Sequence, residues 1–143
     1  MKAEQIFSIV NLIALIGWII LAVAPRWIVT RKVVLSGAIP LLLAVAYLIL
    51  IVIFFGKSEG SFGSLAGVMQ LFTNQWTVLA GWIHYLAFDL FVGVWEVKDS
   101  QEKGISHWFV IPCLFLTFML GPIGFLLYSI LRLFLAKNEV KND

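Results

Sequence analysis

The sequence is poor in charge and in the residues from which soluble proteins build sites and cross-links. Of its 143 residues only 13% are charged, one is cysteine, two are histidine and four are proline, whereas 62% are hydrophobic. A soluble domain carries about 25% charged residues, and a chain this apolar has too few polar groups to coat a surface exposed to water. These proportions exclude a soluble enzyme, a disordered chain and a disulfide scaffold. They predict an integral membrane protein.

The charges that are present are nearly balanced, with ten basic and eight acidic residues. A net charge of +2 gives no reason to expect a nucleic-acid partner. The single cysteine, Cys113, cannot form an internal disulfide, and we expect it to be an inert buried thiol. Aromatic residues make up 15% of the chain. That proportion suits anchoring at both membrane interfaces, and it also suits a pocket for a long apolar ligand.

Four apolar stretches are each long enough to cross a membrane, because a helix needs roughly 20 residues to span about 30 Å of hydrocarbon. Between the second and the third lies the segment 61–75, which is apolar but rich in glycine, and we expect a short interfacial or re-entrant helix there. The predicted fold class is all-α, with a single four-span transmembrane domain over residues 1–143 arranged as a helical bundle. The expected spans are residues 6–24, 33–55, 76–95 and 108–131.

An even number of spans places both termini on one side of the membrane, and the basic residues then fail to decide the orientation. Both termini and the second loop carry five of them: Lys2, Lys57, Arg132, Lys137 and Lys141. The opposite side also carries five: Arg26, Arg31, Lys32, Lys98 and Lys103. The tight cluster of the first three favours its own side as the cytoplasmic one. The loop from Glu96 to Gly104 mixes acidic residues with lysines, and we expect it to be solvated.

Two ionisable residues, His84 and Asp89, interrupt the third span. An ionised carboxylate at the centre of a bilayer costs about 2.5–3.5 kcal/mol even on lenient insertion scales, so Asp89 must be protonated, paired or open to water. Tyr85 precedes Asp89 by one helical turn on the same face, which allows its phenol to donate a hydrogen bond to the carboxyl group. His84 lies about 140° from Asp89 around the helix, so the two are not neighbours but can border one cleft.

The fourth span carries His107 at its start and a stripe of small and polar residues along one face. The Gly121-Pro122 step within it removes one backbone hydrogen bond, which predicts a kink. In the first span, Asn11 is expected to make a hydrogen bond between helices. The stripe follows spacings of three and four residues and consists of Cys113, Thr117, Gly121, Gly124, Tyr128 and Arg132.

The string His84-Tyr85-Leu86-Ala87-Phe88-Asp89-Leu90-Phe91-Val92-Gly93 is followed by Gly104-Ile105-x-His107-Trp108 and by Leu120-Gly121-Pro122-x-Gly124. This combination resembles the neoxanthin synthase-like family of membrane proteins, also called the abscisic-acid-deficient-four-like family. The match is dense from about Trp76 to Leu131 and loose before Gly56. The resemblance implies a small four-span protein, and plant members of the family are required to convert the epoxy-carotenoid violaxanthin into the allenic neoxanthin.

This chain shows no long plastid transit peptide ahead of its first span. We therefore expect either a bacterial relative, a multi-pass protein of the inner cell membrane, or a chain from which such a peptide has been removed. Because bacteria rarely make violaxanthin, the substrate is left open, and the ligand expected from the resemblance is a hydrophobic polyene or isoprenoid among the membrane lipids. Whether the chain acts as a homo-oligomer or with a partner enzyme stays open too.

The implied reaction needs no cofactor for redox chemistry, because the epoxide and the allenic alcohol are isomers. It needs an acid to protonate the epoxide oxygen and a base to take a proton from the adjacent polyene carbon. On this resemblance Asp89 is the acid and His84 or His107 the base, while Tyr85 orients Asp89 or the substrate hydroxyl. The residues expected to bind the substrate are Trp82, Phe88, Phe91, Trp108 and Thr117.

Two other functions fit the same residues. The bundle could bind a carotenoid, quinone or lipid without chemistry, or serve as an assembly subunit for a partner enzyme. The third hypothesis is a metal or haem site, since His84, His107 and Asp89 match a two-histidine, one-carboxylate iron set in ligand number. Their spacing argues against it, because Asp89 follows His84 by five residues rather than three or four, and the two histidines are roughly 16 Å apart in depth.

Overall fold

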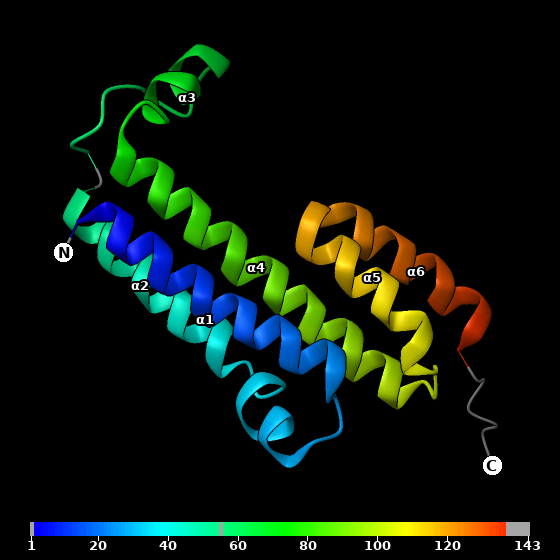
Figure 1. The fold of residues 1–143 in the computed structure, drawn as a ribbon. Helices are drawn as coiled ribbons and strands as arrows, with labels where there is room; N and C mark the ends of the chain where they lie inside the picture. The colour runs from blue at the N-terminus through cyan, green and yellow to red at the C-terminus, as the bar shows by residue number, and fades with distance from the viewer. Residues whose placement is uncertain (1, 55, 137–143) are drawn as a thin grey trace, which may run out of the picture. The chain divides into compact units, whose positions relative to one another are not determined.

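The computed structural model describes residues 2–54 and 56–136, and over these residues every regular element is a helix, with turns and irregular segments between the helices. The prediction of an all-α fold is therefore confirmed for the described part of the chain. Phe55, at the end of the second expected span, and the tail residues Lys137 and Lys141 lie outside it. In chain order the helices are α1 (Ala3–Val23), a π-helix (Thr30–Val34), α2 (Ala38–Phe54), α3 (Leu65–Leu71), α4 (Gln75–Glu102), α5 (His107–Leu120) and α6 (Pro122–Leu135) (Figure 1).

Three helical segments are long and apolar enough to cross a membrane: Ala3–Val23, Thr30–Phe54 and Gln75–Glu102. They correspond to the first three expected spans. The third differs from its expectation, because α4 does not end at Trp95 but continues to Glu102. The last turns of α4 therefore include residues 96–102 of the segment that was expected to be a solvated loop. Helices of this length and composition fit a membrane protein.

The fourth expected span, residues 108–131, is not one helix. Gly121, with a φ of +42°, separates α5 from α6, and each of these helices has 14 residues, which is too short to cross the hydrocarbon. Pro122 opens α6, a position where its missing N–H is not needed. The sequence predicted a kink at this step, but the chain reverses there and α5 and α6 lie side by side as a hairpin (Figure 1). A bundle of four spans is thus not confirmed.

The described residues up to Leu15 form a first compact unit together with Ile39–Phe88. Asn11 makes the expected hydrogen bond between helices, since the indole Nε1 of Trp82 donates to its Oδ1 at 3.1 Å. The segment between α2 and α4 contains α3, whose first turn is capped by the Ser64 hydroxyl; the expected place of this helix at the membrane interface stays a prediction. The buried core of the unit consists of Val10, Ala14, Leu43, Leu50, Leu79, Ala80, Ile83, Leu86 and Ala87.

The second compact unit consists of Ile16–Ala38 and the described residues from Asp89 onward. It contains the end of α1, the π-helix, the second half of α4 and the α5–α6 hairpin. Two glycines let its helices approach closely. A Cβ atom on Gly93 of α4 would lie 2.6 Å from the Trp18 ring of α1, and one on Gly124 of α6 would collide with the backbone of Thr117 of α5. A larger residue at Gly124 would therefore require α5 and α6 to separate, whereas one at Gly93 would require the Trp18 ring to shift.

Candidate functional site

Asp89 lies at the midpoint of the 28 residues of α4. Its carboxyl group lies against the tip of the α5–α6 hairpin, where a Cβ atom built on Gly121 would be 2.8 Å from Asp89 Oδ1 and 3.2 Å from Oδ2. The side chain is half-buried. The backbone of Gly121, at the break between α5 and α6, thus lies next to Asp89, the acidic residue that the sequence placed inside a span.

Two further acidic residues of α4 lie on the same face as Asp89. Glu96 follows Asp89 by seven residues and Asp99 follows Glu96 by three, and both spacings return to one side of a helix. Both side chains are buried: Glu96 is 0% and Asp99 8% exposed. The expectation that the segment from Glu96 to Gly104 is solvated is therefore wrong for these two residues.

Glu96 is held by a residue of the hairpin. The hydroxyl of Thr117 on α5 donates to Glu96 Oε1 at 2.9 Å, and Thr117 is itself fully buried. The other carboxyl oxygen, Oε2, is buried without a hydrogen-bond partner within the described residues. A buried polar atom left without a partner is rare and expensive, so this carboxyl group is as unusual a feature as Asp89.

Asp99 binds the C-terminal part of the hairpin. Its Oδ2 accepts hydrogen bonds from the Tyr128 hydroxyl at 2.7 Å and from Arg132 Nε at 2.7 Å, and its Oδ1 accepts one from Arg132 Nη2 at 3.0 Å. The guanidinium thus bridges both carboxylate oxygens, the strong geometry for this pair. Tyr128 is only 1% exposed and is part of a buried contact.

The hairpin side of this contact is the stripe of small and polar residues that the spacing predicted. Of its members, Cys113, Thr117, Gly121, Gly124 and Tyr128 are all buried, and the thiol of Cys113 is free, as expected. Sequence reasoning missed the partners of this stripe on α4, Glu96 and Asp99. The signal was the seven-residue spacing from Asp89 to Glu96, which continues the helix face beyond the expected end of the span.

His107 and Trp108, both expected at the site, open α5 at the other end of the hairpin. The ring Nε2 of His107 lies 2.8 Å from the carbonyl oxygen of Ala22, in the last turn of α1. Trp108 is 81% exposed. Both residues line a cleft of about 520 Å³ beside the connection from α1 to the π-helix. The structure gives no contact of either residue with Asp89.

The other expected site residues lie on the first half of α4 or face outward. His84 is exposed; its ring stacks on Phe88 with centroids 4.6 Å apart and meets Tyr47 of α2 edge-on at 5.6 Å. Trp82 contacts Tyr85, with ring centroids 5.3 Å apart. Phe88 and Phe91 are both more than half exposed. The roles expected for these residues stay predictions.

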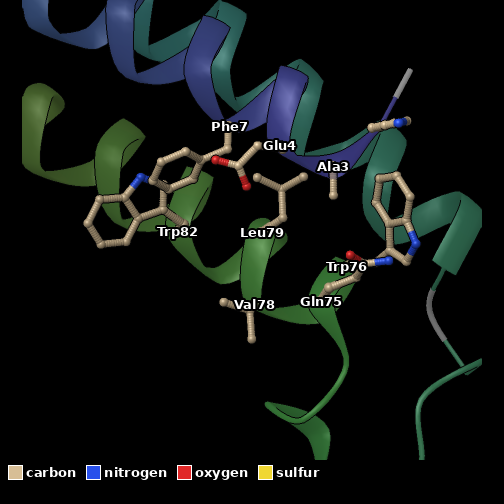
Figure 2. A pocket seen from close by; sticks show the side chains of 9 residues that line it. Ala3, Glu4, Phe7, Gln75, Trp76, Val78, Leu79 and Trp82 are labelled. Atoms are coloured by element: carbon tan, nitrogen blue, oxygen red, sulfur yellow. The ribbon is translucent and has the colours of Figure 1, made fainter.

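Among the clefts of the described residues, the following two are apolar and are each lined by residues of the first unit alone. One, of about 600 Å³, lies between α2, the segment around α3 and α4; His84 lines it together with Tyr47, Phe54, Phe72 and Trp76. The other, of about 710 Å³, lies at the start of α1 and α4, where Glu4 and Phe7 face Leu79 and Trp82 (Figure 2). Clefts of this size can hold a small apolar ligand.

Within the described residues, no group of three or more histidine, cysteine, aspartate or glutamate side chains is placed to hold a metal ion. The metal-site hypothesis required His84, His107 and Asp89 to converge. The structure records His107 against the Ala22 carbonyl and His84 against aromatic rings.

The fold and the site define an all-helical protein of the membrane type, in which buried carboxyl groups on one long helix are covered by a helical hairpin. The chain belongs to the ABA DEFICIENT 4-like family, whose family model matches residues 5–128. Family membership inferred from the sequence motifs is thereby confirmed.

Among curated proteins the chain is similar to Protein ABA DEFICIENT 4, chloroplastic, from Arabidopsis thaliana. The two are 26% identical over 112 residues, which cover 73% of this chain and 51% of that protein. The chain therefore spans about half the length of this relative. No solved structure matches the chain.

Proposed function

We propose that this chain is a membrane-embedded isomerase for a carotenoid or a related isoprenoid. Asp89 donates a proton to an epoxide oxygen of the substrate, and a histidine, His84 or His107, removes a proton from the adjacent polyene carbon. The observation that carries the proposal is the position of Asp89, whose carboxyl group lies at the midpoint of α4 against the backbone of Gly121. Membership of the ABA DEFICIENT 4-like family supports the choice of substrate class.

The proposed reaction is balanced without a redox partner. Protonation of the epoxide oxygen assists cleavage of one carbon–oxygen bond, and loss of a proton from the neighbouring carbon shifts the double bonds to give an allenic alcohol of the same formula. The acid and the base each contribute by being positioned at the reacting atoms.

The surroundings of the two histidines favour His84 as the base. His107 is engaged with the Ala22 carbonyl oxygen at 2.8 Å, a contact that joins the start of α5 to the end of α1. His84 instead lines the apolar cleft of about 600 Å³ in the first unit. A histidine that borders an apolar cleft is available to a bound polyene in a way that one committed to a backbone carbonyl is not.

The direct test is conversion of an added epoxy-carotenoid by the purified chain in lipid nanodiscs, with products separated by chromatography and identified by mass spectrometry. Asp89→Asn keeps the shape of the side chain but cannot donate the proton, so we expect its turnover to fall at least a hundredfold, in line with the usual contribution of a general acid. His84→Gln should lose turnover similarly, and His107→Gln should keep most of it. Full activity in Asp89→Asn would refute the proposal.

The matched control is Glu102→Gln, which also neutralises an acidic residue of α4, but one that is exposed. It should convert substrate at the wild-type rate. Thermal unfolding of each variant in the same detergent separates loss of chemistry from loss of folding.

A second candidate function is binding of a polyene, quinone or lipid without chemistry, which the apolar clefts of the first unit favour. This candidate predicts that a hydrophobic molecule co-purifies in mild detergent and is released unchanged. Mass spectrometry of the extracted molecule, before and after incubation, distinguishes the two functions. On this second reading Gly81→Leu, which places a large side chain against Phe72 in the cleft, should release the molecule, whereas Asp89→Asn should retain it.

A further inference from the structure

We infer that the chain crosses the membrane three times and that α5 and α6 form a re-entrant hairpin, which enters from the cytoplasmic side, reaches the middle of the bilayer and returns to the side it came from. This inference is independent of the proposed function. It rests on the contacts between the hairpin and the second half of α4, all of which lie within the second unit.

Both ends of the hairpin lie at the same end of α4. α5 begins at His107, after a short connection from the end of α4 at Glu102. α6 returns to that level, because Arg132 in its last turns binds Asp99 through two hydrogen bonds. The chain therefore leaves the hairpin on the side of the membrane where α4 ends.

The tip of the hairpin lies at half the depth of α4. Gly121 contacts the carboxyl group of Asp89, the residue at the midpoint of that helix. The ten residues from Asp89 to Asp99 rise about 15 Å, which is half of a hydrocarbon core of about 30 Å. Helices of 14 residues are long enough for that depth but too short for a complete crossing.

The hairpin also explains how α4 tolerates its acidic residues. Three carboxyl groups on one face of a spanning helix cannot be left against lipid. The hairpin covers that face and supplies the Thr117 hydroxyl to Glu96 and the Tyr128 hydroxyl and Arg132 guanidinium to Asp99. It has to enter from the side where α4 ends, because the acidic residues occupy that half of the helix.

Three crossings place the segment before α1 and the segment after α6 on opposite sides of the membrane. Three crossings change how the basic residues divide between the two sides of the membrane. With four spans, each side carried five of them. Only Lys2 and Lys57 now lie on the side of the N-terminus. The other side carries eight: Arg26, Arg31, Lys32, Lys98, Lys103, Arg132, Lys137 and Lys141.

An excess of lysine and arginine marks the cytoplasmic side. Eight against two is a clear bias, so the tie that the four-span arrangement produced is resolved. The inferred topology differs from the expectation that both termini share one side, and it places the open end of the hairpin in the cytoplasm. The earlier preference for the side of Arg26, Arg31 and Lys32 as cytoplasmic agrees with this orientation.

The test uses single cysteines and a membrane-impermeant maleimide on the full chain in a bacterial inner membrane, with Cys113→Ala removing the native thiol. Phe62→Cys should be labelled from the outside in intact spheroplasts. Ser36→Cys, Gln101→Cys and Asn142→Cys should be labelled only after the membrane is permeabilised. None of these substitutions changes the count of basic residues.

Labelling of Asn142→Cys and Phe62→Cys from the same side would restore four spans and overturn the inference. Labelling of Phe62→Cys only after permeabilisation would overturn the assigned orientation. Because a cysteine variant can fail to fold, a second measurement uses fusions to the wild-type chain. Alkaline phosphatase fused after residue 143 should be inactive, and green fluorescent protein fused there should fluoresce, because the first works only outside and the second folds only inside.

Discussion

Glu96 and Thr117 form a buried hydrogen-bonded pair between α4 and α5. Both side chains are fully buried, and one carboxyl oxygen has the Thr117 hydroxyl as its donor while the other is without a partner within the described residues. A buried polar group that loses its partner costs more than the hydrogen bond itself contributes, because it keeps the desolvation penalty. The stability of the contact between α4 and α5 should therefore depend strongly on one hydroxyl group.

Thr117→Val should lower the free energy of unfolding by about 1–3 kcal/mol, because it leaves both oxygens of Glu96 without a donor. Thermal unfolding in detergent measures this as a lower midpoint. The double variant Glu96→Leu with Thr117→Val should recover much of the loss, since removing both partners leaves no buried polar group unsatisfied. Ser129→Ala is the control: its exposed hydroxyl bonds only to a carbonyl of its own helix. A midpoint for Thr117→Val equal to that of Ser129→Ala would contradict this account.

Gly121 has two separate reasons to be glycine. Its φ of +42° disfavours a side chain, and a Cβ atom would lie 2.8 Å from Asp89 Oδ1. Gly37 shares only the first reason, because its φ is +83° and a Cβ atom there would meet nothing within 4 Å. The pair therefore separates backbone strain from contact with the carboxyl group.

Gly37→Ala should cost about 1–2 kcal/mol of unfolding free energy from backbone strain alone, and Gly121→Ala should cost clearly more. In a background with Asp89→Ala, the added cost of Gly121→Ala should shrink to that of Gly37→Ala. A double-mutant cycle measured by thermal unfolding gives the difference. Equal costs for Gly121→Ala in both backgrounds would show that the carboxyl group does not lie at the hairpin tip.

At the scale of elements, the α5–α6 hairpin depends on side-chain contacts with α4 because it is too short to be held by the bilayer as a span. Asp99 is the contact point for α6, through Tyr128 and the bridging guanidinium of Arg132. Arg132 is partly exposed, so solvent weakens the charge pair, whereas the Tyr128 contact is buried. Loss of the Asp99 carboxylate should loosen α6 more than any other helix.

Asp99→Asn should raise amide hydrogen exchange in α6 severalfold, with little change in α1 or α2, when measured by mass spectrometry in nanodiscs. Tyr128→Phe should produce part of this effect, because the guanidinium still binds Asp99. Lys98→Gln, next to Asp99 but exposed, serves as the control and should leave α6 exchange unchanged. A uniform rise over all helices after Asp99→Asn would mean that α6 is not tethered by this residue.

The helices also show which features of the fold the sequence pattern predicted and which it did not. Hydropathy predicted three of the helices, and the spacing of Cys113, Thr117 and Gly124 predicted the buried face of the hairpin. Hydropathy could not predict the reversal at Gly121, because the length of an apolar run does not show whether the chain continues straight or turns back within it. The reversal depends on a positive φ and on the fit against Asp89, a contact over 32 positions of sequence.

Burial of Glu96 escaped prediction for a related reason. An acidic residue just beyond an apolar run is normally solvated, and only the partner on α5 makes its burial tolerable. That partner, Thr117, lies 21 residues further along the chain, so the residues around Glu96 do not indicate that it will be buried. The helix-face spacing from Asp89 indicated the direction of Glu96 but not what covers it.

At the scale of the whole molecule, the acidic face of α4, the short hairpin and the basic residues make one consistent arrangement. The carboxyl groups occupy the half of α4 that the hairpin covers. In the three-crossing topology that we infer, eight of the ten basic residues lie on one side of the membrane. The proposed chemistry depends on one part of this arrangement, the position of Asp89 at the midpoint of α4 against the hairpin tip.

The central claim is that the hairpin tip and Asp89 lie at the middle of the bilayer. A measurement of the depth of the hairpin tip tests this claim most directly. Spin labels on single cysteines at Ile123, Trp108 and Phe134, all exposed, report depth through their accessibility to oxygen and to a water-soluble nickel complex. We expect the label at Ile123 to lie at the middle of the hydrocarbon, and the labels at Trp108 and Phe134 to lie together near one interface. A label at Ile123 that is as accessible to the nickel complex as the other two would place Asp89 outside the hydrocarbon and contradict the account.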